Sequence, residues 1–330
     1  MSESFDVAGI GNAIVDVLAP VTDKFLLERN IAKGVMTLID EFRAQQLYDA
    51  FGATTEMAGG SAANTMAGLA SLGGRALFIG KIKNDRLGQS FSDSLKQLDV
   101  RFTTEMATDG PSTACCLIAV TPEGQRSLNT YLGASREISR DDVDEMAVAQ
   151  SAVLYIEGYL WDQPEAKAAI EKAIVAAKRA QRRVALTLSD PFCVGRYREE
   201  FLELMKTRVD ILFANEEEAK ALFEVGEFDG VLQALHAWHG IAAVTRSEKG
   251  CVVAHKHEVH VLDAHPVRRV VDTTGAGDQF AAGFLYGLTH EKRLADCGRL
   301  GALAAAEVIS HFGARPEVSL KAFAEEAGLL

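Results

Sequence analysis

The feature that most constrains the fold of this chain is a regular alternation of two patterns from about residue 150 onward. Short apolar runs such as AVLYIEGYL, RVALTLSD, DILFAN and IAAVTR alternate with longer helical patterns such as EAKAAIEKAIVAAKRAQ, EEFLELMKT and EEEAKALFEV. Repeated strand–helix–strand units make successive strands parallel and bring helices onto both faces of the sheet. The sequence therefore predicts an α/β fold with a mainly parallel central sheet flanked by helices, whose ligands bind beyond the carboxyl ends of the strands.

Two stretches in the first half of the chain have a different pattern, at roughly residues 14–40 and 100–133. β-rich runs on either side of residues 122–124, Pro-Glu-Gly, predict a hairpin in the second stretch. No Pro- or Ser-rich linker separates these stretches from the α/β pattern. We therefore expect a single α/β domain over residues 1–330, with a small β-sheet lid built from the two stretches.

Charge and hydropathy exclude several classes of function. The formal net charge of −12 argues against nucleic-acid binding, because such a surface needs a basic face. No apolar run is long enough to span a bilayer, and the first residues, MSESFDVAGI, lack the pattern of a secretory signal. We therefore expect a cytoplasmic protein with neither nucleic-acid nor membrane partners. An anionic ligand would need local positive charge from a metal ion, helix N-termini or a few basic side chains.

One segment, VVDTTGAGDQFAAGFLYGL at residues 270–288, combines a strand end, a glycine turn and a helix start. Unpaired N–H groups at such a start bind anions, so Gly275, Ala276 and Gly277 are candidate donors to a phosphate. Asp278 follows at once, where it would repel an anion unless it handles a proton. It would then be the base that accepts the proton of an attacking hydroxyl. The alternative is structural: Asp278 would only stabilise the helix N-terminus, and the glycines would only form a turn.

Four separated motifs resemble those of one kinase family. DTTGAGD at 272–278 and GGSAAN at 59–64 are similar to the two signatures of the ribokinase (PfkB-type) family of carbohydrate and nucleoside kinases. NEEE at 215–218 contains that family's N-x-x-E pattern, and Asn12 with Asp16 matches its GN-x-x-x-D pattern. The chain is identified as a member of this family. The resemblance implies a ribokinase-like fold, ATP as co-substrate and Mg²⁺ as cofactor, and it leaves a monovalent cation open as a second cofactor.

The resemblance also implies which residues hold the phosphate acceptor. Gly60, Ser61 and Asn64 would lie against the acceptor, with Asn64 bonded to a sugar hydroxyl. Asn12 and Asp16 would bind two vicinal hydroxyls, because an amide and a carboxylate supply a donor and an acceptor. From the residues alone, Ser61 is a helix cap and Asp16 is a turn residue.

A second set of residues is implied on the ATP side. Asn215 and Glu218 would organise Mg²⁺, with Glu218 acting through water, because magnesium retains several of its waters. From the residues alone, the run of glutamates is a solvated helix start. Thr245 in the loop VTRSEKG, Thr273 and the glycines of DTTGAGD would contact the phosphates of ATP, although this loop departs from the commoner family form. Arg126 would reach the phosphates from the lid.

The middle of the chain bears on the identity of the acceptor. LTLSDPFCVG followed by VDILFANEEEA resembles the adenosine kinase branch of the family. In that match Phe192 would stack on a purine, an interaction worth about 1–3 kcal/mol. Leu128 and Leu132 of the lid would close over the base, whereas from the residues alone all three side chains are ordinary core packing.

We therefore expect an ATP-dependent kinase that converts adenosine to AMP at the 5′-hydroxyl, as in purine salvage. A sugar kinase acting on ribose or fructose is the first alternative. A catalytically silent binding protein is the second, although a protein that only binds a ligand needs no base at Asp278. The sequence leaves both a monomer and a homodimer open.

Overall fold

The computed structural model describes residues 4–330, so residues 1–3 of the expected domain lie outside the described part of the chain. Within the described residues the larger of two sheets has nine strands, in the order β14-β13-β12-β11-β10-β9-β1-β5-β6. These strands are β1 (Phe5–Ile10), β5 (Ala76–Ile79), β6 (Arg101–Phe102), β9 (Ser151–Glu157), β10 (Arg183–Thr187), β11 (Ile211–Asn215), β12 (Ile241–Thr245), β13 (Cys251–His255) and β14 (Glu258–Leu262).

The large sheet is mainly parallel, as the alternation of strands and helices predicted. All neighbouring strands from β6 to β12 pair in parallel, whereas β13 and β14 add an antiparallel edge. Every residue of β5 is buried, and so are six of the seven residues of β9. Such continuous burial is typical of parallel strands that are covered on both faces.

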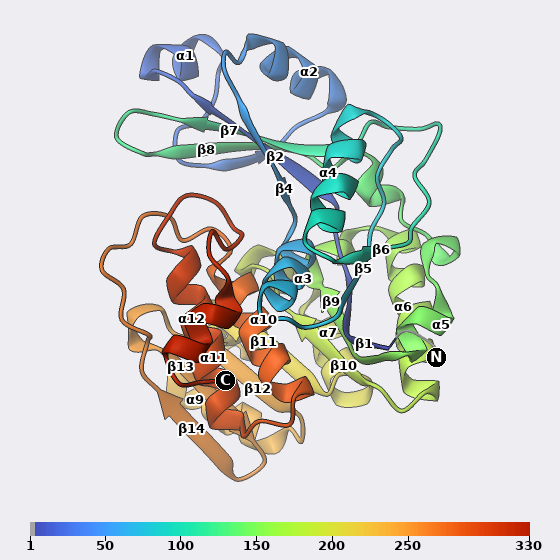
Figure 1. Cartoon of the computed structure of the whole chain (residues 1–330), viewed down its shortest axis with the longest axis vertical. Helices are drawn as coiled ribbons and strands as arrows, with labels where there is room; N and C mark the ends of the chain where they lie inside the picture. Colours follow the sequence, from blue (N-terminus) through green and yellow to red (C-terminus); the bar gives the residue numbers. More distant parts are fainter. Residues whose placement is uncertain (1–3) are drawn as a thin grey trace.

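Helices cover both faces of the large sheet (Figure 1). One face packs against α3 (Ser61–Ser71), α4 (Arg86–Gln97), α10 (Ala276–Thr289), α11 (Leu294–Val308) and α12 (Leu320–Glu326). The other packs against α5 (Glu145–Ala149), α6 (Pro164–Arg179), α7 (Pro191–Thr207), α8 (Glu216–Phe223) and α9 (Phe228–Ala237). No helix within residues 4–330 is both long enough and apolar enough to cross a bilayer.

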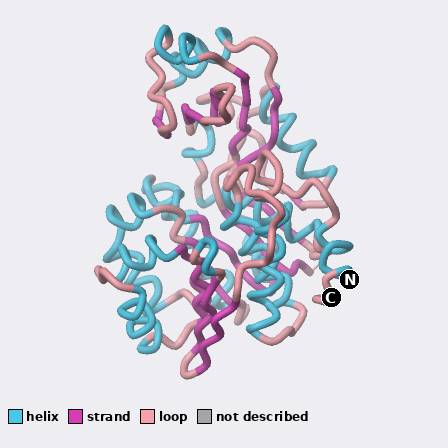
Figure 2. The backbone as a smooth tube through the Cα atoms, turned by 90° about the vertical axis from the view of Figure 1, so that its left-hand side faces the viewer, coloured by secondary structure: helices cyan, strands magenta, loops and turns pink. Residues whose placement is uncertain are grey.

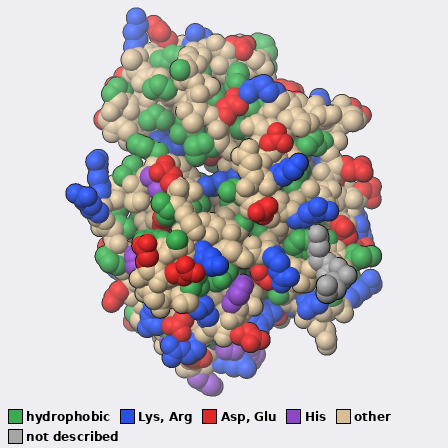
Figure 3. Space-filling view, in the orientation of Figure 1, with side chains coloured by type: hydrophobic (Ala, Val, Ile, Leu, Met, Phe, Trp, Pro, Cys, Tyr) green, Lys and Arg blue, Asp and Glu red, His purple; other side chains and the backbone are tan. Residues whose placement is uncertain are grey.

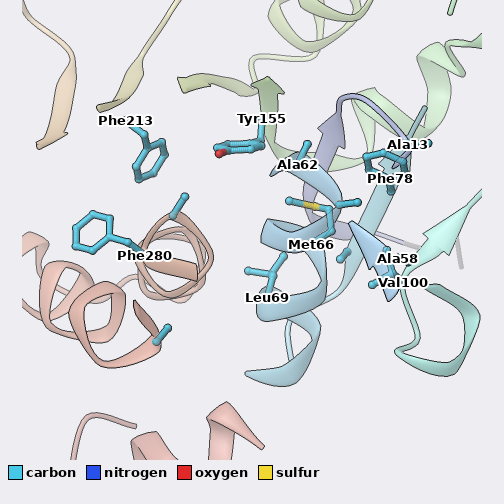
Figure 4. Packing of buried hydrophobic residues seen from close by; sticks show 14 of the residues in the cluster. Ala13, Ala58, Ala62, Met66, Leu69, Phe78, Val100, Tyr155, Phe213 and Phe280 are labelled. Atoms are coloured by element: carbon cyan, nitrogen blue, oxygen red, sulfur yellow. The ribbon is translucent and has the colours of Figure 1, made fainter. Parts of the chain in front are cut away.

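The packing of α3 beside α10 positions the candidate site. Met66 and Leu69 from α3, Phe280 from α10 and Phe213 from β11 contribute to one buried core (Figure 4). The ring of Phe213 lies 5.9 Å from that of Tyr155 on β9, which joins the helices to the centre of the sheet. Both helices begin with a sequence motif, so this packing brings the two motifs together.

The smaller sheet has the order β3-β8-β7-β2-β4 and stands apart from the large sheet (Figures 1 and 2). Its strands are β2 (Ile14–Pro20), β3 (Met36–Leu38), β4 (Thr55–Gly59), β7 (Ala114–Val120) and β8 (Arg126–Tyr131). Four of them come from the two stretches expected to form a lid, and β7 and β8 form an antiparallel hairpin around residues 122–124. Helices α1 (Asp23–Glu28) and α2 (Glu41–Ala50) pack on this sheet.

Two strands differ from the expected lid. β4 lies outside both stretches, yet it pairs with β2 along its whole length. β6 lies inside the second stretch, yet it pairs with β5 in the large sheet. Both strands are short, and their positions depend on partners far away in the sequence, which a local pattern does not specify.

One face of the small sheet looks toward the large one. Residues that pair directly on neighbouring strands share a face, so Asp16, Arg126 and Leu128 lie on the face opposite to the one that α1 and α2 cover. Arg126 forms an ion pair with Asp272, which follows the large sheet in the chain. The surface is hollowed between the two sheet regions (Figure 3).

Candidate active site

The site is built around the N-terminus of α10. Gly275 is the N-cap and has a left-handed φ of 78°, and a Cβ there would lie 2.7 Å from the backbone of Ala314. Only glycine fits this position without strain. A Cβ on Gly277, in contrast, would meet nothing within 4 Å. The loop therefore packs tightly on one side and is open at Gly277.

The three predicted phosphate donors are not equivalent. The N–H of Ala276 donates to the carbonyl of Thr273 at 3.2 Å. Gly277 and Asp278 belong to the first helical turn, in which N–H groups have no intrahelical acceptor. The donors that α10 offers to a ligand are therefore the N–H groups of Gly277 and Asp278, and Gly275 serves mainly to shape the turn.

The carboxylate of Asp278 is held by two residues of α3. Ser61 Oγ donates to Asp278 Oδ1 at 2.7 Å, and Asn64 Nδ2 donates to Asp278 Oδ2 at 3.1 Å. Burial raises the pKa of Asp278, and these two hydrogen bonds together with the charge of Arg315 oppose that rise. Residues from the motifs at 59–64 and 272–278 thus meet, and they fix the direction of a carboxylate that retains affinity for a proton.

The glycine pair before α3 sets where that helix begins. Gly60 is the N-cap with a φ of 91°, and a Cβ on it would lie 2.1 Å from the carbonyl oxygen of Asn12. The helix has no side-chain cap, so Ser61 is not the capping residue that its sequence allowed. Its hydroxyl is directed to Asp278 instead.

Asn12 is buried and bonded to a carboxylate that the sequence analysis missed. Its Nδ2 donates to Glu157 Oε1 at 2.7 Å, and Glu157 Oε2 accepts from the N–H of Ala62 at 3.0 Å. Burial raises the pKa of Glu157 to about 7. A glutamate within the otherwise apolar run AVLYIEGYL was the available signal. One amide proton of Asn12 is thus already used inside the protein.

Asp16 belongs to the same charged region as Asp278. Burial raises its pKa to about 6, the charges of Arg126 and Arg315 oppose the rise, and the charge of Asp278 adds to it. A Cβ on Gly59 of β4 would lie 2.7 Å from Asp16 Oδ2, so this glycine leaves room for the carboxylate. Asp16 is partly buried and lies on the face of the small sheet that carries Arg126.

Arg126 joins the small sheet to the glycine loop. It forms an ion pair with Asp272, and its Nη1 donates to Thr274 Oγ1 at 2.9 Å. Asp272 also accepts from the N–H groups of Gly313 at 3.0 Å and Thr274 at 3.1 Å. Burial opposes ionisation of Asp272, but these hydrogen bonds and the charge of Arg126 lower its pKa. The guanidinium thus lies at the loop that the sequence predicted to bind phosphate.

Two further residues of the site carry no sequence signal. Arg315 Nε donates to Asn64 Oδ1 at 3.2 Å, and Arg315 Nη1 donates to Ser94 Oγ at 2.9 Å. Gln279 Nε2 donates to the carbonyls of Asn64 at 3.0 Å and Ala314 at 2.9 Å. These bonds tie α3, α10 and the segment after α11 into one unit.

The predicted metal pair forms a helix cap. Asn215 Nδ2 donates to Glu218 Oε1 at 2.6 Å, and the N–H of Glu218 donates to Asn215 Oδ1 at 2.8 Å. Asn215 is also directly paired with Thr245, so both lie at the carboxyl ends of β11 and β12. Thr273 is exposed in the glycine loop.

The capping box still fits a role beside a cation. Glu218 is 6% exposed, and burial raises its pKa to about 7 with no basic side chain among the groups that offset the rise. A nearby hydrated Mg²⁺ would supply the missing positive charge. Within residues 4–330, no group of three or more His, Cys, Asp or Glu side chains is arranged to hold a metal ion.

The residues predicted to wall the acceptor base differ in exposure. Phe192 lies in the first turn of α7 and is 81% exposed. Leu128 on β8 and Leu132 just after it are partly buried. Most of Phe192 is therefore open to solvent in this structure.

Comparison with known proteins identifies the family of the chain. Residues 37–320 match the model of the pfkB family of carbohydrate kinases. A solved adenosine kinase from Sinorhizobium meliloti is 50% identical, covers 98% of this chain and all of its own, and superposes with a TM-score of 0.91. A probable sugar kinase from Rhizobium etli is 47% identical over 99% of both chains, with a TM-score of 0.92.

A more distant relative spans nearly the same length. Adenosine kinase from Saccharomyces cerevisiae is 27% identical over 92% of this chain and 94% of its own. The family match covers most of the chain and includes the motifs at residues 59–64, 215–218 and 272–278. The chain therefore belongs to the pfkB family of carbohydrate kinases.

Proposed function

We propose that this pfkB-family kinase transfers the γ-phosphate of ATP to the 5′-hydroxyl of adenosine, giving AMP and ADP. The observation that carries the proposal is the oriented carboxylate of Asp278 beside the open start of α10. The choice of adenosine rests on the 50% identical adenosine kinase from Sinorhizobium meliloti and on the similar enzyme from yeast. The segment LTLSDPF, which includes Phe192, adds to that choice.

The chemical step follows from what each group can donate or accept. Asp278 accepts the proton of the acceptor hydroxyl, whose oxygen forms a bond to the γ-phosphorus. The bond from that phosphorus to the bridging oxygen of ADP breaks, and ADP leaves with that electron pair. The N–H groups of Gly277 and Asp278 stabilise charge on the transferring oxygens. Ser61 and Asn64 keep the carboxylate aimed throughout.

Mg²⁺ would be held at the carboxyl end of β11, where Asn215 and Glu218 form their capping box. A bound Mg²⁺ neutralises phosphate charge. Thr245 on the adjacent strand would contact the phosphates. Glu218 would then orient a metal-bound water rather than bind the metal itself, because both of its oxygens already accept from Asn215.

The small sheet would act as the lid. Asp16 would bind the ribose hydroxyls, Leu128 would cover the base, and Arg126 would bring its charge to the phosphates. Closing such a lid excludes water and so suppresses ATP hydrolysis. The hydrogen bond from Asn12 to Glu157 leaves Asn12 one free amide proton for the acceptor.

A panel of acceptors tests the proposal. Adenosine, guanosine, inosine, ribose and fructose are compared by ADP release at equal concentrations. We expect adenosine to give the highest kcat/KM by at least tenfold. Equal turnover of ribose and adenosine would refute a site that recognises the base.

Phe192 provides a sharper test of base recognition. Phe192→Ala should raise KM for adenosine about 5- to 150-fold, the equivalent of about 1–3 kcal/mol of stacking, and leave KM for ATP unchanged. Phe42→Ala is the matched control, because Phe42 is also exposed, at 73%, but lies on α2. Identical kinetics in both variants would remove Phe192 from the base site.

A sugar acceptor is the second candidate. It is favoured by the 47% identical probable sugar kinase from Rhizobium etli. The same panel decides between the two candidates, since a sugar kinase would turn over ribose or fructose and ignore the nucleosides. In either case the roles proposed for Asp278 and for the start of α10 are the same.

A further inference from the structure

Arg315 lies at one end of a chain of hydrogen bonds that leads to Asp278. Its Nε donates to Asn64 Oδ1 at 3.2 Å, and Asn64 Nδ2 donates to Asp278 Oδ2 at 3.1 Å. A guanidinium is a donor only and an ionised carboxylate is an acceptor only. The amide between them has therefore one satisfactory orientation, with its oxygen toward Arg315 and its nitrogen toward Asp278.

The backbone that carries Arg315 is fixed to the glycine loop. The N–H of Gly313 donates to Asp272 at 3.0 Å, and the carbonyl of Ala314 accepts from Gln279 at 2.9 Å. Ala314 also packs against Gly275, where a Cβ would lie 2.7 Å away. Movement of Arg315 is thus coupled to the loop that contains Asp278.

Arg315 also carries a charge that two carboxylates share. The charged and titratable groups around Asp278 are Asp16 from β2, Tyr155 and Glu157 from β9, Glu218 from α8 and Arg315 from the segment after α11. Within the described residues, Arg315 is the cation whose charge lowers the pKa of Asp278, and it lowers that of Asp16 together with Arg126. Its Nη2 is buried and forms no hydrogen bond within the described protein atoms.

We propose that Arg315 is a positioning residue for the base: it fixes the Asn64 amide that holds Asp278, and it places a positive charge one amide away from that carboxylate. The inference rests on the proposed function of Asp278 and deepens it. Ser94, which accepts from Nη1 at 2.9 Å, anchors the far side of the guanidinium. Neither role requires Arg315 to touch the substrate.

The test compares wild type, Arg315→Met and Arg315→Lys in the pH dependence of kcat/KM for adenosine. Loss of a nearby cation raises the pKa of a carboxylate, so the base would stay protonated to higher pH. We expect the acid limb of the Arg315→Met profile to move up by about one pH unit. Arg315→Lys keeps the positive charge but loses the planar guanidinium that bonds both Asn64 and Ser94. The acid limb of its pH profile should therefore stay near that of wild type, while kcat falls.

A second measurement does not depend on turnover. The urea midpoint of unfolding is followed from pH 4 to pH 8 in wild type, Arg315→Met and Arg315→Met/Asp278→Asn. A carboxylate whose pKa is higher in the folded than in the unfolded protein lowers the free energy of unfolding as the pH rises between the two pKa values. Arg315→Met should therefore lose stability relative to wild type as the pH rises, and adding Asp278→Asn should restore part of the loss.

The outcomes separate this inference from the proposed function. If wild type phosphorylates adenosine but the acid limb of the Arg315→Met profile stays at the wild-type pH, the inference about Arg315 fails and the proposed function stands. If wild type phosphorylates none of the acceptors, the proposed function fails, and the unfolding curves still decide on the charge of Arg315. Parallel curves for wild type and Arg315→Met over the pH range would overturn the role of Arg315 as a charge that favours ionised Asp278.

Discussion

Adding a single methyl group at Gly277 should separate catalysis from stability. A Cβ on this residue meets nothing within 4 Å, so Gly277→Ala introduces no clash with the protein. Gly277 is the second residue of α10 and is not among the glycines with positive φ, so alanine suits its backbone. Replacing glycine by alanine at such a site stabilises a protein by about 0.4–1 kcal/mol. We expect a small increase in the free energy of unfolding.

The same methyl group would occupy the space where a phosphoryl oxygen must approach the N–H groups of the first turn. Displacing the phosphoryl group by about 1 Å costs on the order of 10² in rate. That factor corresponds to about 2.7 kcal/mol of activation free energy. Gly277→Ala should therefore lower kcat about 100-fold while the protein becomes slightly more stable.

Gly275→Ala is the matched control in the same loop. It forces alanine to a φ of 78° and brings its Cβ to 2.7 Å from Ala314. The left-handed conformation and the overpacking together cost about 2–5 kcal/mol. Urea titration and ADP release on both variants give the comparison. A Gly277→Ala protein with kcat within twofold of wild type would refute a phosphoryl group at this helix start.

Three further predictions concern buried contacts around the site. In wild type, the raised pKa of Glu157, about 7, lowers the free energy of unfolding as the pH rises from about 4.5 to 7. Glu157→Gln should flatten this fall in urea titrations across that range. Equal slopes of unfolding free energy against pH in wild type and variant would contradict this. Arg126→Met removes the ion pair with Asp272, so it should raise KM for ATP about tenfold. It should also speed amide hydrogen exchange in β7 and β8. Unchanged exchange would show that the ion pair does not hold the small sheet in place. Gly68→Ala should lower the free energy of unfolding by about 1–3 kcal/mol, because its Cβ would lie 2.0 Å from Gln279 Oε1; an unchanged urea midpoint would mean that the glutamine moves freely.

The parts of the fold that follow from local patterns were predictable. The apolar runs from β9 to β12 are continuous and separated by helical segments, and they indicated a parallel sheet without any knowledge of partners. The hairpin of β7 and β8 has its turn residues in the sequence. β4 was not predictable in this way, because five residues ending in glycine form a strand only where β2 supplies their hydrogen bonds.

The candidate site was likewise predictable only where its residues lie in local motifs. Asp278 lies in a glycine-rich helix start that indicates anion binding, and Ser61 and Asn64 lie in a motif that resembles the acceptor site of the family. The structure joins these three residues by hydrogen bonds. Arg315 lies in the irregular segment HFGARPEV, and only the packing of α11 against α10 brings it to Asn64. Glu157 could have been noticed as a charge in an apolar strand, but its partners come from two other segments.

The direction of a side chain is also outside what a motif specifies. Asn12 was expected to face a ligand, and the structure adds a hydrogen bond from its Nδ2 to Glu157 that the motif did not indicate. Phe192 was expected to lie against a base, and 81% of the residue is exposed in this structure. Both residues have the expected position at a strand end or helix start, and their orientation depends on neighbours that only the folded chain supplies.

The most direct test of the account replaces the carboxylate of Asp278 by an amide of the same shape. Asp278→Asn should lower kcat for adenosine phosphorylation by a factor on the order of 10² or more, because the hydroxyl loses its base, while KM changes little. Its urea midpoint should stay close to that of wild type, so that the loss is chemical. A variant that phosphorylates adenosine at the wild-type rate would contradict the assignment of Asp278 as the base.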